Sequence, residues 1–134
     1  MLEYEMATDG FSFLKKQEKY KIAKQEVPFL SRCIDVVLMN RNDEVISIEF
    51  KISKWRHAIE QAKNHKLGAD KAYICLPERQ MSKALYLAIQ EAGIGLLLYD
   101  PERKDRIHEV IPAPDQNSNI PVFRTMLLSN LDKV

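Results

Sequence analysis

The sequence predicts an α/β (α+β) fold in which a mixed central sheet is flanked by helices. Three observations lead to this class. Apolar and polar residues alternate in the first half of the chain, apolar residues then recur at a helical spacing after residue 51, and two short apolar runs follow with another helical segment between them. A period of two indicates strands, and a period near 3.6 indicates helices. The predicted core therefore has the order αβββαβ, with further elements after it.

The first helix is expected over residues 2–16, although Gly10 weakens this prediction because glycine inside a helix costs about 1 kcal/mol relative to alanine. Three strands follow, at residues 20–29, 33–39 and 43–52. The segment 40–43 reads Asn-Arg-Asn-Asp, a composition typical of a tight turn, so the second and third strands are expected to form a hairpin. Three successive antiparallel strands result.

The third strand has two chemically different faces, because side chains alternate along a strand. One face would carry Ile46, Ile48, Phe50 and Ile52. The other would carry Val45, Ser47, Glu49 and Lys51. The first face is entirely apolar, whereas the second ends in an acid followed by a base.

The second half of the chain alternates helices and buried strands. Trp55, Ala58, Ile59 and Ala62 recur at i, i+3, i+4 and i+7, which predicts a helix that ends near Gly68. The later elements are a strand at 71–76, a helix at 80–92, a strand at 94–99, an edge strand at 106–111, a polar loop at 112–119 and a terminal helix at 122–131. Helices of this length return the chain to the edge of the sheet where the strand began, so parallel strands are expected.

Composition indicates one domain over residues 1–134, because 46% of the chain is hydrophobic and can form a single core. No apolar run approaches the roughly 20 residues that span a bilayer, and the chain does not start like a signal peptide, so we expect a soluble, intracellular (cytoplasmic) protein. Cys33 and Cys75 match no metal-binding spacing and are expected to be reduced thiols in the core. The net charge of +1 does not decide whether the protein binds nucleic acid.

Two carboxylates are expected to lie side by side, because the predicted hairpin places Asp35 beside Glu49. Such a pair is costly to bury without a partner cation. A divalent metal ion is the obvious partner.

These residues carry a resemblance to a known family. The dipeptide Ile34-Asp35, thirteen intervening residues, and then Glu49-Phe50-Lys51 directly before a helix resemble the motif of the PD-(D/E)XK nuclease superfamily. The residue before Asp35 is isoleucine and not proline, which departs from the family pattern. The resemblance covers roughly residues 1–100 and implies a restriction-endonuclease-like fold and metal-dependent hydrolysis of DNA.

The resemblance also implies a role for each motif residue. Asp35 and Glu49 would hold Mg²⁺, with Mn²⁺ as a substitute, since Mg²⁺ prefers carboxylate oxygens. The backbone carbonyl of Phe50 would be a further ligand. Lys51, two residues after Glu49 and therefore on the same face of the strand, would orient or deprotonate the attacking water and offset charge in the transition state.

The resemblance implies two further members of the site, each with an alternative. Related nucleases carry a catalytic glutamine on the helix after the motif, which implies this role for Gln61; the alternative is a solvent-exposed glutamine. Many members also place an acidic metal ligand on the first helix. Glu3 is preferred over Glu5 for that position, because Glu3 lies nearer the apolar stripe. His57 and His65 match no zinc motif and are expected to be ordinary surface residues.

Basic residues on the helix after the motif suggest DNA as the partner. Lys54, Arg56 and Lys63 are the expected phosphate contacts, although such residues can also be simply solvated. Two functions remain open: a metal-dependent DNA endonuclease, or a non-catalytic nucleic-acid-binding or assembly module on the same fold. One site cuts one strand, so we also expect a homodimer. Its contact would be the apolar terminal segment with Phe123, Met126, Leu127, Leu128 and Leu131.

Overall fold

The computed structural model describes residues 1–115 and 119–133, so residues 116–118 of the expected polar loop and residue 134 lie outside the described part of the chain. The helices and strands are α1 (Glu3–Lys15), β1 (Tyr20–Phe29), β2 (Arg32–Asn40), β3 (Val45–Phe50), α2 (Trp55–His65), β4 (Lys71–Pro77), α3 (Lys83–Ala92), β5 (Gly95–Tyr99), β6 (Ile107–Ile111) and α4 (Pro121–Leu131). The predicted order of elements is confirmed.

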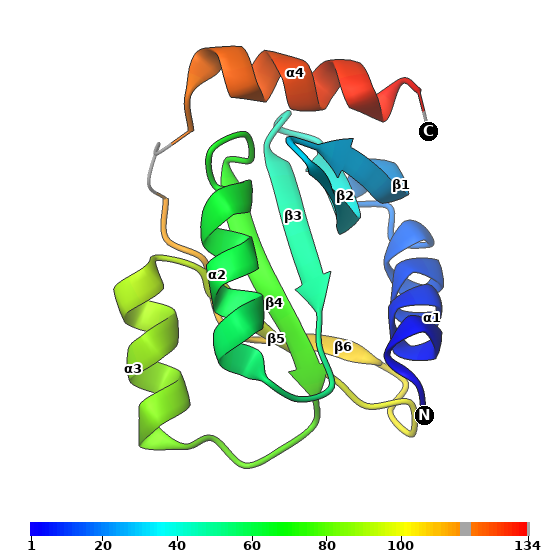
Figure 1. Ribbon diagram of the computed structural model, residues 1–134. Coiled ribbons are helices and arrows are strands. Elements are labelled where there is room, and N and C mark those ends of the chain that lie inside the picture. The colour runs from blue at the N-terminus through cyan, green and yellow to red at the C-terminus, as the bar shows by residue number, and fades with distance from the viewer. Residues whose placement is uncertain (116–118, 134) are drawn as a thin grey trace.

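The strands form one six-stranded sheet in the order β1-β2-β3-β4-β5-β6 (Figure 1). Strands β1, β2 and β3 are antiparallel neighbours, β3, β4 and β5 are parallel, and β6 pairs antiparallel with β5 at the edge. The sheet is therefore mixed, as predicted. The two parallel pairs follow from α2 and α3, which carry the chain back along the sheet.

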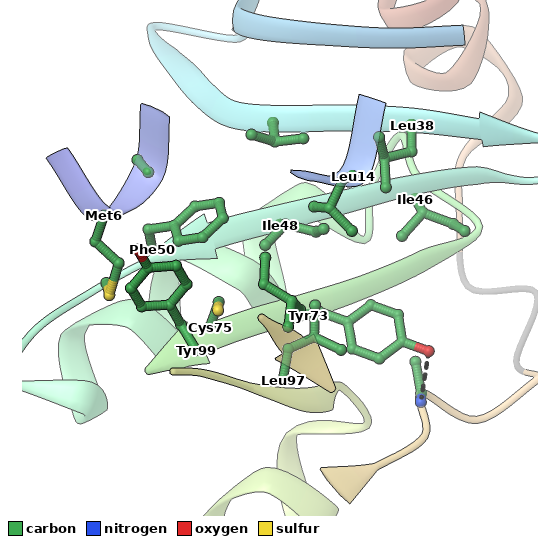
Figure 2. Close-up of a cluster of buried hydrophobic side chains, with 14 residues drawn as sticks. Met6, Leu14, Leu38, Ile46, Ile48, Phe50, Tyr73, Cys75, Leu97 and Tyr99 are labelled. Atoms are coloured by element: carbon green, nitrogen blue, oxygen red, sulfur yellow. Dashed lines mark hydrogen bonds between the residues drawn. The ribbon is translucent and has the colours of Figure 1, made fainter. Parts of the chain in front are cut away.

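Helix α1 covers one face of the sheet, α2 and α3 cover the other, and α4 lies across the end where β1 and β2 are found (Figure 1). A separate apolar cluster fills each of these interfaces between helices and sheet. The cluster under α1 includes Met6, Leu14 and Phe50, and the cluster under α2 and α3 includes Ile59 and Ile89. Figure 2 shows the first of these, with Phe50 among the neighbouring core side chains. All six residues of β3 are buried, because helices cover both of its faces.

Two predictions about individual segments were wrong. Helix α3 begins at Lys83 and not at residue 80, because the hydroxyl of Ser82 accepts a hydrogen bond of 3.1 Å from the backbone N–H of Leu85 and caps the helix there. Cys33 is exposed and is not a core thiol. It lies one residue from the turn between β1 and β2, whereas its neighbour Ile34 faces the core.

The apolar face of α4 packs on the chain's own sheet. Leu127 and Leu131 are buried against β1 and β2, Phe123 and Leu128 are partly buried there, and of the five residues expected to form a dimer contact only Met126 is exposed. The proposed contact surface was therefore wrong, because the structure uses it internally. The homodimer itself stays a prediction.

Gly10 lies inside α1 because the helix approaches β3 very closely at this point. A Cβ atom on residue 10 would lie 2.7 Å from Cε1 of Phe50, a side chain that is fully buried. We expect Gly10→Ala to lower the melting temperature, because overpacking a core costs about 1 to 3 kcal/mol and exceeds the gain of about 1 kcal/mol in helix propensity. The exposed change Ser12→Ala on the same helix is the control and should stabilise slightly. A Gly10→Ala variant as stable as the wild type would contradict the close packing.

Candidate functional site

The site is built at the carboxyl end of β3, where β2 and β3 bring two acidic side chains together. Val36 pairs with Ile48 in the antiparallel register, so Asp35 and Glu49 occupy the next facing positions. Asp35 Oδ2 accepts a hydrogen bond of 2.8 Å from the backbone N–H of Phe50. The side chain of Glu49 is only 8% exposed. The Phe50 side chain is buried under α1, so Phe50 can contribute to the site only through its backbone.

The two carboxyl groups interact strongly. Burial, followed by the charge of Asp35 and a hydrogen bond with it, raises the pKa of Glu49 to about 9. Burial also raises the pKa of Asp35, against the opposing hydrogen bond from the Phe50 backbone. Desolvation and the charge of a second carboxylate raise the free energy of the ionised form by more than its few hydrogen bonds lower it. The neutral form is therefore favoured. Without a cation, burial and the neighbouring Asp35 therefore favour the neutral form of Glu49.

Glu3 connects α1 to this site. Its Oε1 accepts a hydrogen bond of 3.0 Å from the backbone N–H of Ile52, and its Oε2 lies 3.9 Å from Nζ of Lys51. Glu5 points elsewhere, because its Oε1 accepts from the backbone N–H of Leu2 and caps the helix. Glu3 is thus the acidic residue of α1 that lies at the site, where it contacts Lys51 and the backbone of Ile52.

His65 is a neighbour of the carboxylate pair that sequence reasoning missed. It is buried and not on the surface, its Nε2 lies 3.9 Å from Oε2 of Glu49, and burial lowers its pKa to about 4. Gln61, one helical turn earlier, is partly buried and not solvent-exposed. The i, i+4 spacing of Gln61 and His65 was a usable signal, because such residues share one face of a helix.

Glu26 is a second missed residue. The β1–β2 register places it opposite Asp35, and its charge contributes to the raised pKa of Asp35. Its backbone has φ of 55°, in the left-handed region that a residue with a Cβ rarely adopts. Nothing in the sequence indicates that conformation.

The expected phosphate contacts lie on α2 and at the residue that precedes it. Lys54, Arg56 and Lys63 are all exposed. The guanidinium of Arg56 lies 4.4 Å from the centre of the Trp55 ring, and Lys63 Nζ lies 3.5 Å from Oε1 of Glu60. These cations are accessible to a ligand, but within the described part of the chain none of them forms an ion pair with Asp35 or Glu49.

The donor set at the site fits a hard divalent cation. Oε2 of Glu49 is buried and has no hydrogen-bond partner among the described residues, and the neighbouring Asp35 supplies a second carboxylate. Within residues 1–115 and 119–133, no group of three or more His, Cys, Asp or Glu side chains is arranged to hold a metal. Two carboxylates supplemented by a backbone carbonyl and water suit Mg²⁺, which is usually held by one or two protein carboxylates and retains several waters.

The raised pKa of Glu49 makes stability depend on pH. Between the ordinary value of 4.5 and about 9 the folded protein binds more protons than the unfolded chain, so the free energy of unfolding falls as pH rises. We expect metal-free protein to lose at most about 1.4 kcal/mol per pH unit between pH 7 and 9 from this group. Chemical denaturation of wild type and Glu49→Gln measures the difference. Equal slopes in the two proteins would show that Glu49 ionises normally.

His65 acts at the opposite end of the pH range. Its pKa falls from 6.5 to about 4 on folding, so the stability that it contributes is lost as pH decreases through this interval. Well above pH 6.5 the histidine is neutral in both the folded and the unfolded state. Burial also raises the pKa of Cys75, so the contribution of Glu49 is the difference in slope between the wild type and Glu49→Gln.

Comparisons with known proteins identify the class of fold. No family model and no curated protein sequence matches the chain. Among solved structures, a protein of unknown function from Silicibacter pomeroyi has a TM-score of 0.70 at 20% sequence identity, with 99% of this chain and 86% of that chain covered. A repair endonuclease from Pyrococcus abyssi has a TM-score of 0.54 at 17% identity, with 85% and 48% covered. A complex of EndoMS with double-stranded DNA has a TM-score of 0.52 at 18% identity, with 76% and 46% covered.

The chain therefore has a restriction-endonuclease-like fold, as the motif implied. It spans about half the length of the repair endonuclease and of EndoMS. At these identities the similarity establishes the fold and does not transfer an activity. No helix among the described residues is long and apolar enough to cross a membrane.

Proposed function

We propose that this protein is a metal-dependent nuclease that hydrolyses phosphodiester bonds in DNA. The observation that carries the proposal is the pair formed by the buried Glu49 and the partly buried Asp35, with the charge of Lys51 acting on Glu49 and Glu3 in contact with Lys51. Placing two carboxyl groups and an ammonium together at a largely buried position is costly, so a purely structural role is a weak explanation for the set. The solved endonuclease structures that share this fold also support a nuclease function.

Asp35 and Glu49 would hold Mg²⁺, or Mn²⁺ in its place, together with the Phe50 carbonyl. Such an ion polarises the phosphoryl group and lowers the pKa of a bound water. Glu3 is retained as an expected further ligand, although its hydrogen bond to Ile52 and its contact with Lys51 support a positioning role equally well.

Lys51 would supply positive charge where negative charge develops during attack on phosphorus. It is suited to this task because its side chain is partly buried and Glu3 restrains it at the end of β3. Gln61 is expected to help orient the substrate or the attacking water from α2. Lys54, Arg56 and Lys63 would neutralise phosphates along the bound strand.

A cleavage assay tests the proposal. Purified protein is incubated with plasmid, single-stranded and branched DNA, with and without Mg²⁺ or Mn²⁺. We expect metal-dependent cleavage of at least one substrate and none by Glu49→Gln. Absence of cleavage on all substrates with both metals, together with retained DNA binding, would instead support a non-catalytic nucleic-acid-binding module.

A further inference from the structure

A small cleft on the side of α2 is lined by His65, the residue that also lies near Glu49. It lies between the turn that joins β1 to β2 and the face of α2, and it has a volume of about 200 Å³. This is smaller than the roughly 300 to 1,000 Å³ of pockets that hold drug-sized molecules. We call this space the α2 cleft. Its size suits one planar ring or a comparably small group.

The two walls of the α2 cleft differ in chemistry. Phe29 and Leu30 supply apolar surface from the strand end and the turn, whereas Gln61 and Asn64 supply carboxamides from α2. Each carboxamide carries both donors and an acceptor. An apolar surface opposite mixed donors and acceptors matches a heterocyclic base, which offers a flat face for packing and a polar edge for hydrogen bonding.

Two polar atoms beside the α2 cleft lack partners. Oε1 of Gln61 and Nδ1 of His65 are buried and have no hydrogen-bond partner among the described residues. Buried polar groups in folded proteins are nearly always paired, so each exception requires an explanation. The side chain of His65 is only 8% exposed, and its residue lines the α2 cleft. A polar ligand seated there would account for both atoms after a small adjustment of the side chains.

The charges around the α2 cleft argue against a simple anion site. Arg32 and His57 line it, but Glu60 lines it as well and places a carboxylate at the same rim. A free phosphate could accept hydrogen bonds from Arg32 and His57 but would be repelled by the carboxylate of Glu60. A neutral polar ring would avoid that repulsion.

The position of the α2 cleft relates it to the chemistry. His65 lines the α2 cleft, and its Nε2 lies 3.9 Å from Oε2 of Glu49. We propose, on the basis of the nuclease function proposed above, that the α2 cleft binds one nucleobase of the DNA strand next to the phosphate that is cut. Binding the base fixes the position of that phosphate relative to Asp35 and Glu49, and the base must leave the helical stack or belong to a single strand.

Binding without cleavage is the first test. Metal-free protein is titrated with the four deoxynucleosides, and the resonances of Leu30 and His57 are followed by NMR. At least one nucleoside should shift both resonances, and inorganic phosphate alone should not. The variant Asn64→Trp fills the α2 cleft from an exposed position and should weaken nucleoside binding by at least about tenfold, the effect of losing one stacked base. Ser129→Trp, at an exposed position on α4, is the matched control.

Cleavage of modified DNA is the second test and requires no change to the protein. An abasic site is moved along the strand relative to the cut, and the KM of each substrate is measured. One abasic position should raise KM by about tenfold or more, and Asn64→Trp should remove that difference.

The outcomes separate this inference from the nuclease proposal. Nucleoside binding by a protein that cuts no DNA would support the α2 cleft as a base site and contradict the nuclease. Active cleavage with equal KM at every abasic position, and no nucleoside-induced shift, would overturn the base site and leave the nuclease standing. Shifts produced equally by inorganic phosphate, or unchanged in Asn64→Trp, would also overturn it.

Discussion

Replacing Lys51 by alanine is expected to reduce DNA cleavage by roughly 10²- to 10³-fold, the typical cost of losing one preorganised electrostatic group in an active site. Lys51 is proposed to act on the transition state and not to hold the metal, so Lys51→Ala should still bind DNA and Mg²⁺. Single-turnover cleavage at saturating protein measures the rate, and fluorescence anisotropy measures DNA affinity.

The competing interpretation of Lys51 is an ion pair with Glu3 and nothing more. The distance of 3.9 Å and the partial exposure of both side chains make such a pair worth at most about 1 kcal/mol of stability. Lys63→Ala, an exposed lysine on α2, is the control and should change DNA affinity more than the rate. A Lys51→Ala variant that cleaves at nearly the wild-type rate would remove Lys51 from the catalytic set.

Mg²⁺ or Mn²⁺ is expected to raise the melting temperature of the wild type and to leave the double variant Asp35→Asn with Glu49→Gln unchanged. An ion that binds only the folded state stabilises it by about 2.7 kcal/mol when present at 100 times its Kd. The ion also offsets the desolvation and repulsion that oppose ionisation of both Asp35 and Glu49, and the amide variants cannot ionise. Thermal unfolding with increasing metal concentration, followed by circular dichroism, is the measurement.

The metal-free double variant should fold, because amide side chains of nearly the same shape replace the two carboxyl groups and leave no unpaired buried charge. The control is Glu91→Gln with Asp132→Asn, which makes the same change of charge on exposed residues away from the site. That control should respond to metal as the wild type does. An equal rise in the Asp35/Glu49 variant would place the metal elsewhere on the molecule.

The sequence by itself determined the order of the elements and the position of the carboxylate pair. The spacing of apolar residues is a local property of the sequence, so the change from period two to period 3.6 after β3 located α2. The turn residues before Glu44 fixed the hairpin of β2 and β3. Hairpin register then placed Asp35 opposite Glu49, because pairing across a short turn leaves little freedom. The choice of Glu3 over Glu5 also came from a local pattern, the distance of each residue from the apolar stripe of α1.

Only the tertiary structure decided what surrounds that pair. His65 and Glu26 approach the carboxylates through the packing of α2 on the sheet and through a left-handed residue in β1, and neither depends on nearby sequence. The packing partner of α4 was also decided only by the tertiary structure. Its apolar residues suited a dimer contact and an internal contact equally well, and the described structure buries Leu127 and Leu131 against β1 and β2. The physical reason is that a hydrophobic stripe requires burial but does not specify its partner, since the hydrophobic effect has no direction.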